Sequence, residues 1–151
     1  MPMEIKRIQE NKKAYLPLLL LADEQEDMID RYLDRGDMYV LEDEGRALAS
    51  IVVTDEGSGL LEIKNLAVLP SAQKQGYGRR MIRFVAERYR AGYHTLLVGT
   101  GDSPLTIPFY ERCGFVRSHA VRNFFVDHYD HPIIEEGVQL RDMIYFKKST
   151  G

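Results

Sequence analysis

Residues 60–89 read LLEIKNLAVLPSAQKQGYGRRMIRFVAERY, and this stretch decides the fold of the chain. Residues 60–68 form an apolar run that predicts a strand, which Pro70 ends. The glycine-containing residues 73–78 predict a loop. Beyond it, apolar side chains recur at helical spacing, at Met81, Ile82, Val85 and Tyr89. The stretch is therefore a strand, a loop rich in backbone donors, and a helix.

The start of this helix has the features of an anion site. A helix start leaves its first N–H groups unpaired and carries partial positive charge. Gly76 and Gly78 lack side chains where an anion would approach the backbone, and Arg79 adds a positive charge in the first turn. The loop fits neither the dinucleotide pattern G-x-G-x-x-G, whose third glycine is replaced by Met81, nor a Walker P-loop.

Three motifs in this order resemble the GNAT superfamily of N-acetyltransferases, which bind acetyl-coenzyme A. They are Leu66-Ala67-Val68-x-Pro70, the loop Gln73-x-x-Gly76-x-Gly78, and Phe109-Tyr110-x-x-x-Gly114-Phe115. The resemblance covers nearly the whole chain and implies acetyl-CoA as cosubstrate, with no metal. It implies that the cosubstrate is held by Leu66, Ala67, Val68, Gln73, Lys74, Gln75, Gly76, Tyr77, Gly78, Arg79 and Ser103. Ser103 stands where many relatives carry an asparagine, so its contact with coenzyme A is left open.

Composition predicts one domain, residues 1–151. The net charge of −3 argues against a general nucleic-acid binder. The single cysteine, Cys113, excludes an internal disulfide and fits a reducing compartment. No apolar run approaches the ~20 residues of a membrane span, and the first ten residues lack the apolar core of a signal peptide. We therefore expect a cytoplasmic protein that contacts no membrane.

The remaining patterns predict the element order β–α–α–β–β–β–α–β–α–β–β. The elements outside the opening stretch are expected at 4–8, 15–22, 28–33, 38–42, 47–54, 95–98, 105–113, 115–125 and 143–146. Gly36 is expected to end a helix in the left-handed conformation, and residues 127–137 are expected to form a loop. This order predicts an α/β (α+β mixed) fold with helices on both faces of the sheet. The GNAT resemblance adds a central mixed, mostly antiparallel sheet whose central strands splay apart.

Glu62 is the candidate general base. An acyl acceptor amine must lose a proton before it attacks, and a carboxylate or an ordered water can take it. Strand alternation places Glu62, Lys64 and Leu66 on one face, with Ile63 and Asn65 on the other. A Glu62–Lys64 pair on an exposed face is the competing interpretation. The GNAT resemblance favours the catalytic one, because family members that use a strand glutamate carry it at this position.

Tyr110 is the candidate general acid. It matches the family tyrosine four residues before Gly114, and a phenol can protonate a departing thiolate if the site assists. A half-buried packing aromatic is the alternative. Cys113 has no neighbouring base pattern that would make it a nucleophile. Residues 127–131, DHYDH, fit helical zinc spacing poorly and are interpreted as a solvated loop near the acceptor site.

The leading hypothesis is an N-acetyltransferase that moves an acetyl group from acetyl-CoA to a primary amine by direct attack in a ternary complex. A non-catalytic acyl-CoA-binding sensor would keep the loop without needing Glu62 or Tyr110, and an interaction module with a decayed site would have lost the loop as well. The expected partners are acetyl-CoA and an amine acceptor, and a homodimer is left open. The acidic residues 23–27 form a solvated helix start or attract a cationic amine.

Overall fold

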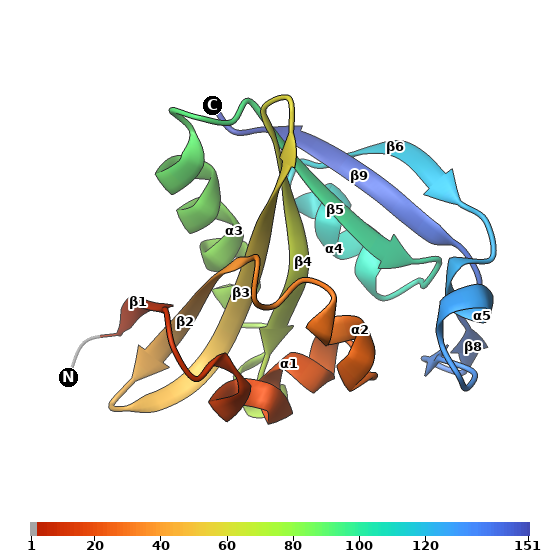
Figure 1. Ribbon diagram of the computed structural model, residues 1–151, viewed down its shortest axis with the longest axis horizontal. Coiled ribbons are helices and arrows are strands. Elements are labelled where there is room, and N and C mark those ends of the chain that lie inside the picture. Colours follow the sequence, from red (N-terminus) through yellow and green to blue (C-terminus); the bar gives the residue numbers. More distant parts are fainter. Residues whose placement is uncertain (1–2) are drawn as a thin grey trace.

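In the computed structural model, which describes residues 3–151, one seven-stranded sheet runs through the whole molecule (Figure 1). Its strands, in spatial order, are β1 (Glu4–Ile8), β2 (Asp37–Asp43), β3 (Arg46–Gly57), β4 (Leu60–Val68), β5 (Thr95–Gly101), β9 (Met143–Ser149) and β6 (Val116–Val121). Every neighbouring pair is antiparallel except β4 and β5, which are parallel. The mixed, mostly antiparallel sheet is confirmed. The single-domain reading stays a prediction, which the continuity of this sheet supports.

Two tight turns connect the strands leading to the centre of the sheet. Glu44 and Gly45 join β2 to β3 with φ angles of 52° and 79°. Ser58 and Gly59 join β3 to β4 with φ angles of 54° and 77°. Two consecutive residues with positive φ match the right-handed twist of the flanking strands, which is why glycine recurs in such turns. Both turns lie in the gaps between the strands expected at 38–42, 47–54 and 60–68.

Helices cover both faces of the sheet, as expected. On one face lie α1 (Leu16–Ala22) and α2 (Glu26–Asp30), and Leu19 and Ile29 pack there against Met38 and Val40 of β2. On the other lie α3 (Tyr77–Tyr89) and α4 (Thr106–Arg112), where Met81 packs in one cluster with Tyr110. Single turns of 3-10 helix precede α1 and α3, at Lys12–Tyr15 and Pro70–Ala72. Alternate side chains of β2 point to opposite faces of the sheet and therefore stabilise two separate cores, one on each face.

Two sequence predictions are wrong. Gly36 does not adopt the left-handed conformation; instead, a Cβ there would lie 2.7 Å from a Val52 methyl group, so close packing requires the glycine. The expected strand at 115–125 ends at Val121, and Phe124–His128 form helix α5 instead. In the stretch expected to be a loop, residues 129–133 are irregular, but β7 (Ile134–Glu135) and β8 (Val138–Gln139) form a hairpin. Short elements of this kind depend on contacts far along the chain, such as the bond from the Asn123 N–H to Asp142 at 2.9 Å.

The two central strands separate, as the resemblance implies. β4 and β5 pair only from Leu60 opposite Thr95 to Ile63 opposite Val98, although both strands continue. Figure 1 shows β4 and β5 diverging beyond this point. None of the helices in residues 3–151 is both long and apolar enough to cross a membrane.

Candidate functional site

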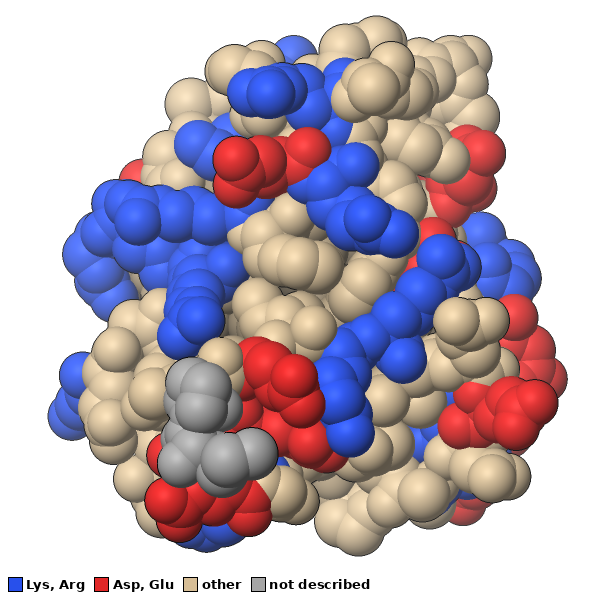
Figure 2. All heavy atoms as spheres, turned by 90° about the vertical axis from the view of Figure 1, so that its left-hand side faces the viewer, with Lys and Arg blue, Asp and Glu red and all other residues tan. Residues whose placement is uncertain are grey.

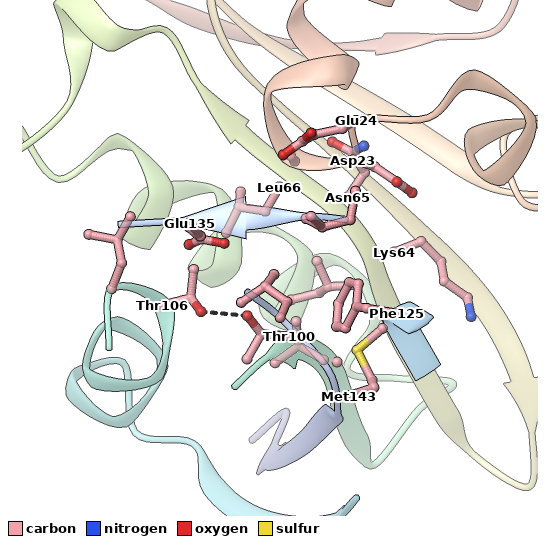
Figure 3. Close-up of a pocket in the computed structure, with 18 of the residues that line it drawn as sticks. Asp23, Glu24, Lys64, Asn65, Leu66, Thr100, Thr106, Phe125, Glu135 and Met143 are labelled. Carbon is pink, nitrogen blue, oxygen red and sulfur yellow. Dashed lines mark hydrogen bonds between the residues drawn. The ribbon is translucent and has the colours of Figure 1, made fainter. Parts of the chain in front are cut away.

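A cavity of about 360 Å³, called here the main cavity, opens where β4 and β5 part. Its walls come from parts that lie far apart in the chain, including β4, β5, α4, α5 and the end of α1. Leu66 and Thr100 lie on the separated strands, and Tyr110 comes from α4. The Thr100 hydroxyl donates to that of Thr106 at 2.6 Å, which ties β5 to α4 across one end of the cavity (Figure 3). Within residues 3–151, no strand pairs beyond Ile63 with the edge of β4 that faced β5.

A β-bulge in β4 changes which side chains share a face. Val53 pairs with Ile63 and Val52 pairs with Asn65, so Lys64 is the extra residue. The sequence prediction that Asn65 shares a face with Ile63 is therefore wrong. Ile63 packs in the α3 core, whereas the Asn65 amide donates to Leu19 O at 3.0 Å on the α1 face. One inserted residue brings both Glu62 and Asn65 to the α1 face, because it shifts the alternation by one.

Glu62 lies in a smaller neighbouring cavity of about 170 Å³, called here the side cavity. The two cavities share lining residues at Lys64 and Tyr129, so they adjoin. Glu62 is buried, and its carboxylate pairs with the Lys64 ammonium at 3.1 Å. Burial raises the pKa of Glu62, while Lys64 opposes that rise. A carboxyl group with a raised pKa is a better proton acceptor than an exposed one, as a general base requires.

Tyr110 is buried between the α4 core and the main cavity. Its ring contacts Phe109, Phe115 and Phe146. Burial raises the pKa of its phenol, and the nearby Glu135 adds to that effect. The turn after α4 fixes its place: Phe115 N–H donates to Tyr110 O at 3.0 Å, and Gly114 adopts a φ of 93°. This is the glycine-ended helix expected from the sequence.

The start of α3 presents free backbone donors. Gly76 precedes the helix with a φ of 84°; among the described residues, a Cβ on it would meet nothing within 4 Å, and no side chain caps the helix. The Gln73 amide donates to Val68 O at 3.3 Å, which fixes the loop against the end of β4. Helix α3 exposes Arg79, Arg80, Arg83 and Arg88. Figure 2 shows Lys and Arg side chains gathered across this side of the molecule. These features suit a phosphate-bearing ligand.

Gly78 and Ser103 both contact other parts of the protein. A Cβ on Gly78 would lie 3.1 Å from the Phe109 ring, so this glycine also lets α3 pack against α4. That contact places the start of α3 beside the helix that carries Tyr110. Ser103 is fully buried; it accepts from Leu105 N–H at 3.0 Å and donates to Glu135 at 3.2 Å. Its hydroxyl therefore caps the turn before α4 and is already engaged by protein groups.

At the other end of the main cavity, a hydrogen-bonded cluster surrounds Asp23. Tyr129 donates to its carboxylate at 2.7 Å and Tyr32 at 3.0 Å, and Asn65 donates to the Tyr32 hydroxyl at 3.1 Å. Burial raises the pKa of Asp23, although these hydrogen bonds oppose the rise. Residues 127–131 are expected to form a solvated loop, but Tyr129 is half-buried in this cluster. His131 contacts Asp130 at 2.6 Å and Glu24 at 3.7 Å.

Residues 34–117 match the domain model described as Acetyltransferase (GNAT) domain. This chain belongs to the GNAT acetyltransferase family. It is 37% identical over 139 residues to the uncharacterized N-acetyltransferase YvbK of Bacillus subtilis, covering 90% of this chain and 89% of that protein. A GNAT family acetyltransferase from Elizabethkingia anophelis, solved with acetyl-CoA bound, superposes with a TM-score of 0.91 at 31% identity over 97% of each chain. A Bacillus subtilis acetyltransferase in complex with CoA superposes with a TM-score of 0.88 at 33% identity, over 98% of this chain and 99% of that one.

The GNAT family and the N-acetyltransferase activity predicted from the sequence are confirmed. Sequence reasoning gave several residues of the main cavity no role, among them Asn65 and Glu135, and placed Tyr129 only in a solvated loop near the acceptor site. Asn65 was placed on the wrong face because strand alternation cannot show a bulge. Tyr129 and Glu135 lay in a stretch read as loop, and only its aromatic and acidic content could have marked them.

Proposed function

We propose that the protein acetylates a primary amine by direct attack on acetyl-CoA in a ternary complex at the junction of β4 and β5. The observation that carries this proposal is the separation of the strands after Ile63 and Val98. In the part of the chain that the structure describes, it leaves a strand edge without a partner strand beside a cavity that Tyr110 lines. An extended amide-containing arm can add to such an edge by main-chain hydrogen bonds.

The residues at the donor end fit acetyl-CoA. The uncapped start of α3 offers N–H groups of Tyr77, Gly78 and Arg79 to a pyrophosphate, and Arg79 adds positive charge. The β4 backbone at Leu66, Ala67 and Val68 would hold the amide arm, with the Val68 carbonyl already occupied by Gln73. Lys74 and Gln75 lie on the exposed loop between β4 and α3. Because its hydroxyl is engaged elsewhere, Ser103 would act by shaping the start of α4.

Glu62 would accept the proton of the attacking amine through an ordered water. It lines the side cavity and not the main one, so a bridging water is needed to reach an amine near Tyr110. Its raised pKa brings it closer to the operating pH than an exposed glutamate would be.

Tyr110 would assist the departing thiolate. Because burial raises its pKa, complete proton transfer to a thiolate of pKa ~8.5 is uphill, and the phenol serves mainly as a hydrogen-bond donor to the developing charge. The ring packing holds Tyr110 in place at the wall of the cavity.

The test is thiol release from acetyl-CoA across a panel of primary amines, with the acetylated product identified by mass spectrometry. Initial rates at varied concentrations of both substrates should give intersecting double-reciprocal lines, because direct attack forms no acetyl-enzyme. Parallel lines, or an acetylated protein formed with acetyl-CoA alone, would exclude the ternary complex. Acetyl-CoA binding with no thiol release for any amine would instead indicate an acyl-CoA sensor. The cytoplasmic location and a homodimer stay predictions.

A further inference from the structure

The main cavity contains two carboxylates whose hydrogen-bond partners are neutral. Asp23 accepts from Tyr32 and Tyr129, and Glu135 accepts from Ser103. Within residues 3–151, neither carboxylate forms an ion pair with a Lys, Arg or His side chain. Lys64, the cation of the cavity wall, is paired with Glu62. Partly buried carboxylates without a cation favour a ligand that supplies one.

A second, independent feature points to a ligand at the Asp23 end. Asn65 is only 3% exposed and lines the main cavity, and its Oδ1 atom accepts no hydrogen bond from any described residue. The amide orientation is fixed, because its nitrogen must donate to the Leu19 carbonyl at 3.0 Å. A buried acceptor without a donor is rare in folded proteins and calls for a group that donates to it.

The cavity has two polar ends joined by apolar walls. Figure 3 shows Asp23, Glu24 and Asn65 at one end and the Thr100–Thr106 pair at the other. Between them the wall is formed by side chains such as Leu66, Val98 and Phe125. Phe125 stacks on Tyr129 with ring centroids 5.5 Å apart, and the faces of such rings attract cations.

Given the proposed acetyltransferase function, we propose that the acceptor is an aliphatic amine carrying a second ammonium group. Asp23 and the Oδ1 of Asn65 hold that second ammonium, while the apolar walls enclose the spacer. The reacting nitrogen then reaches the end of the cavity near Tyr110. An amine with one cationic group would leave the Asp23 end unmatched, and an anionic acceptor would be repelled by Asp23 and Glu135.

The experiment compares 1,ω-diaminoalkanes of three to eight carbons with 1-aminoalkanes of the same lengths, at saturating acetyl-CoA. We expect kcat/KM for the best diamine to exceed that of its matched monoamine by about 10- to 100-fold, the range for a charge-assisted hydrogen bond. Asp23→Asn should bring this ratio close to one, and Asp23→Glu should restore part of it. Asp27→Asn makes the same change at an exposed acid outside both cavities and should keep the ratio. A retained thermal shift with acetyl-CoA would show that each variant is folded.

Two results would overturn the proposal: equal efficiency for matched diamines and monoamines, or a diamine preference that survives Asp23→Asn. Failure of the acetyltransferase function is a separate outcome, seen as no thiol release with any amine. In that case, the thermal shift that each amine gives to the CoA-bound protein tests the second-ammonium site. A shift given by diamines alone and lost in Asp23→Asn supports the second-ammonium site, and the same shift for both amines refutes it.

Discussion

At position 62, burial and a neighbouring cation act on one carboxyl group in opposite directions. Burial raises the pKa of Glu62, and Lys64 at 3.1 Å lowers it. Lys64→Met removes the lowering effect, so the pKa of Glu62 rises further. A general base works only when deprotonated, so the acidic limb of the kcat/KM profile should move to higher pH. The amine's own ionisation is the same for both proteins, so the difference reports Glu62.

The control for this profile is Lys6→Met. It removes an exposed lysine of β1 that forms an ion pair with Glu42 of β2. It should leave the acidic limb in place. Glu62→Gln alone should lower the rate by ~10²–10⁴. When Lys64→Met is added to Glu62→Gln, the acidic limb of the kcat/KM profile should no longer move. Superimposable profiles for parent and Lys64→Met would mean that Glu62 is not the group whose ionisation limits the rate.

Tyr110 separates an enzyme from a binding protein with the same fold. Tyr110→Phe keeps the ring contacts with Phe115 and Phe146, so the free energy of unfolding should fall by no more than ~1 kcal/mol. Turnover should drop by ~10²-fold or more, because the departing thiolate loses its donor. Calorimetric binding of acetyl-CoA should be unchanged and serves as the control. Undiminished turnover in this variant would falsify the donor role.

At the scale of the elements, the start of α3 offers a test in which only charge differs. Asparagine and aspartate both tolerate the left-handed conformation of Gly76, and open space surrounds the position. Gly76→Asn should keep most of the thermal shift given by acetyl-CoA. Gly76→Asp should lose it, because a carboxylate would face the pyrophosphate at the helix start. Gly78 is less suitable, since any side chain there meets Phe109.

If both Gly76 variants keep the same thermal shift with acetyl-CoA, the pyrophosphate lies elsewhere. A shift lost in both would instead indicate that side-chain size, and not charge, blocks the loop.

The elements also show what a single sequence can reveal. The strand–loop–helix at 60–89 was predictable because its periodicity, its proline and its glycines are all local. The bulge at Lys64 was not, because it appears only in the register between β3 and β4. Helix α5 was missed for a similar reason: Phe124 and Phe125 are typical of strands, and their helical conformation depends on contacts with residues 141 and 142.

At the scale of the whole molecule, the end of the main cavity proposed to hold the acceptor is assembled from segments that no local pattern connects. Tyr129 reaches Asp23, which lies 106 residues earlier in the chain, and Asp130 N–H donates to Gln25 at 3.1 Å. The residues proposed to hold acetyl-CoA, by contrast, come mainly from the one continuous stretch at 60–89. This difference explains why the family and cosubstrate could be predicted from the sequence, whereas the acceptor cavity required the fold.

The Asp23 cluster should carry a cost in stability that depends on pH. The pKa of Asp23 is higher in the folded protein than its ordinary value of 3.8, because burial penalises the charged form. The folded state therefore binds this proton more tightly than the unfolded chain does. Stability from this group is complete below pH 3.8 and is lost as pH rises through the raised pKa.

Asp23→Asn carries no ionisable group at this position, so it escapes that loss. The free energy of unfolding of the variant, taken relative to the parent, should rise with pH across this window and then stay constant. Urea unfolding of the variant and the parent at a series of pH values measures the difference directly. A relative stability that falls with pH would mean that the tyrosine hydrogen bonds outweigh burial and that Asp23 needs no ligand cation. A rise together with loss of diamine preference would show that the molecule keeps this carboxylate for binding, at the expense of stability.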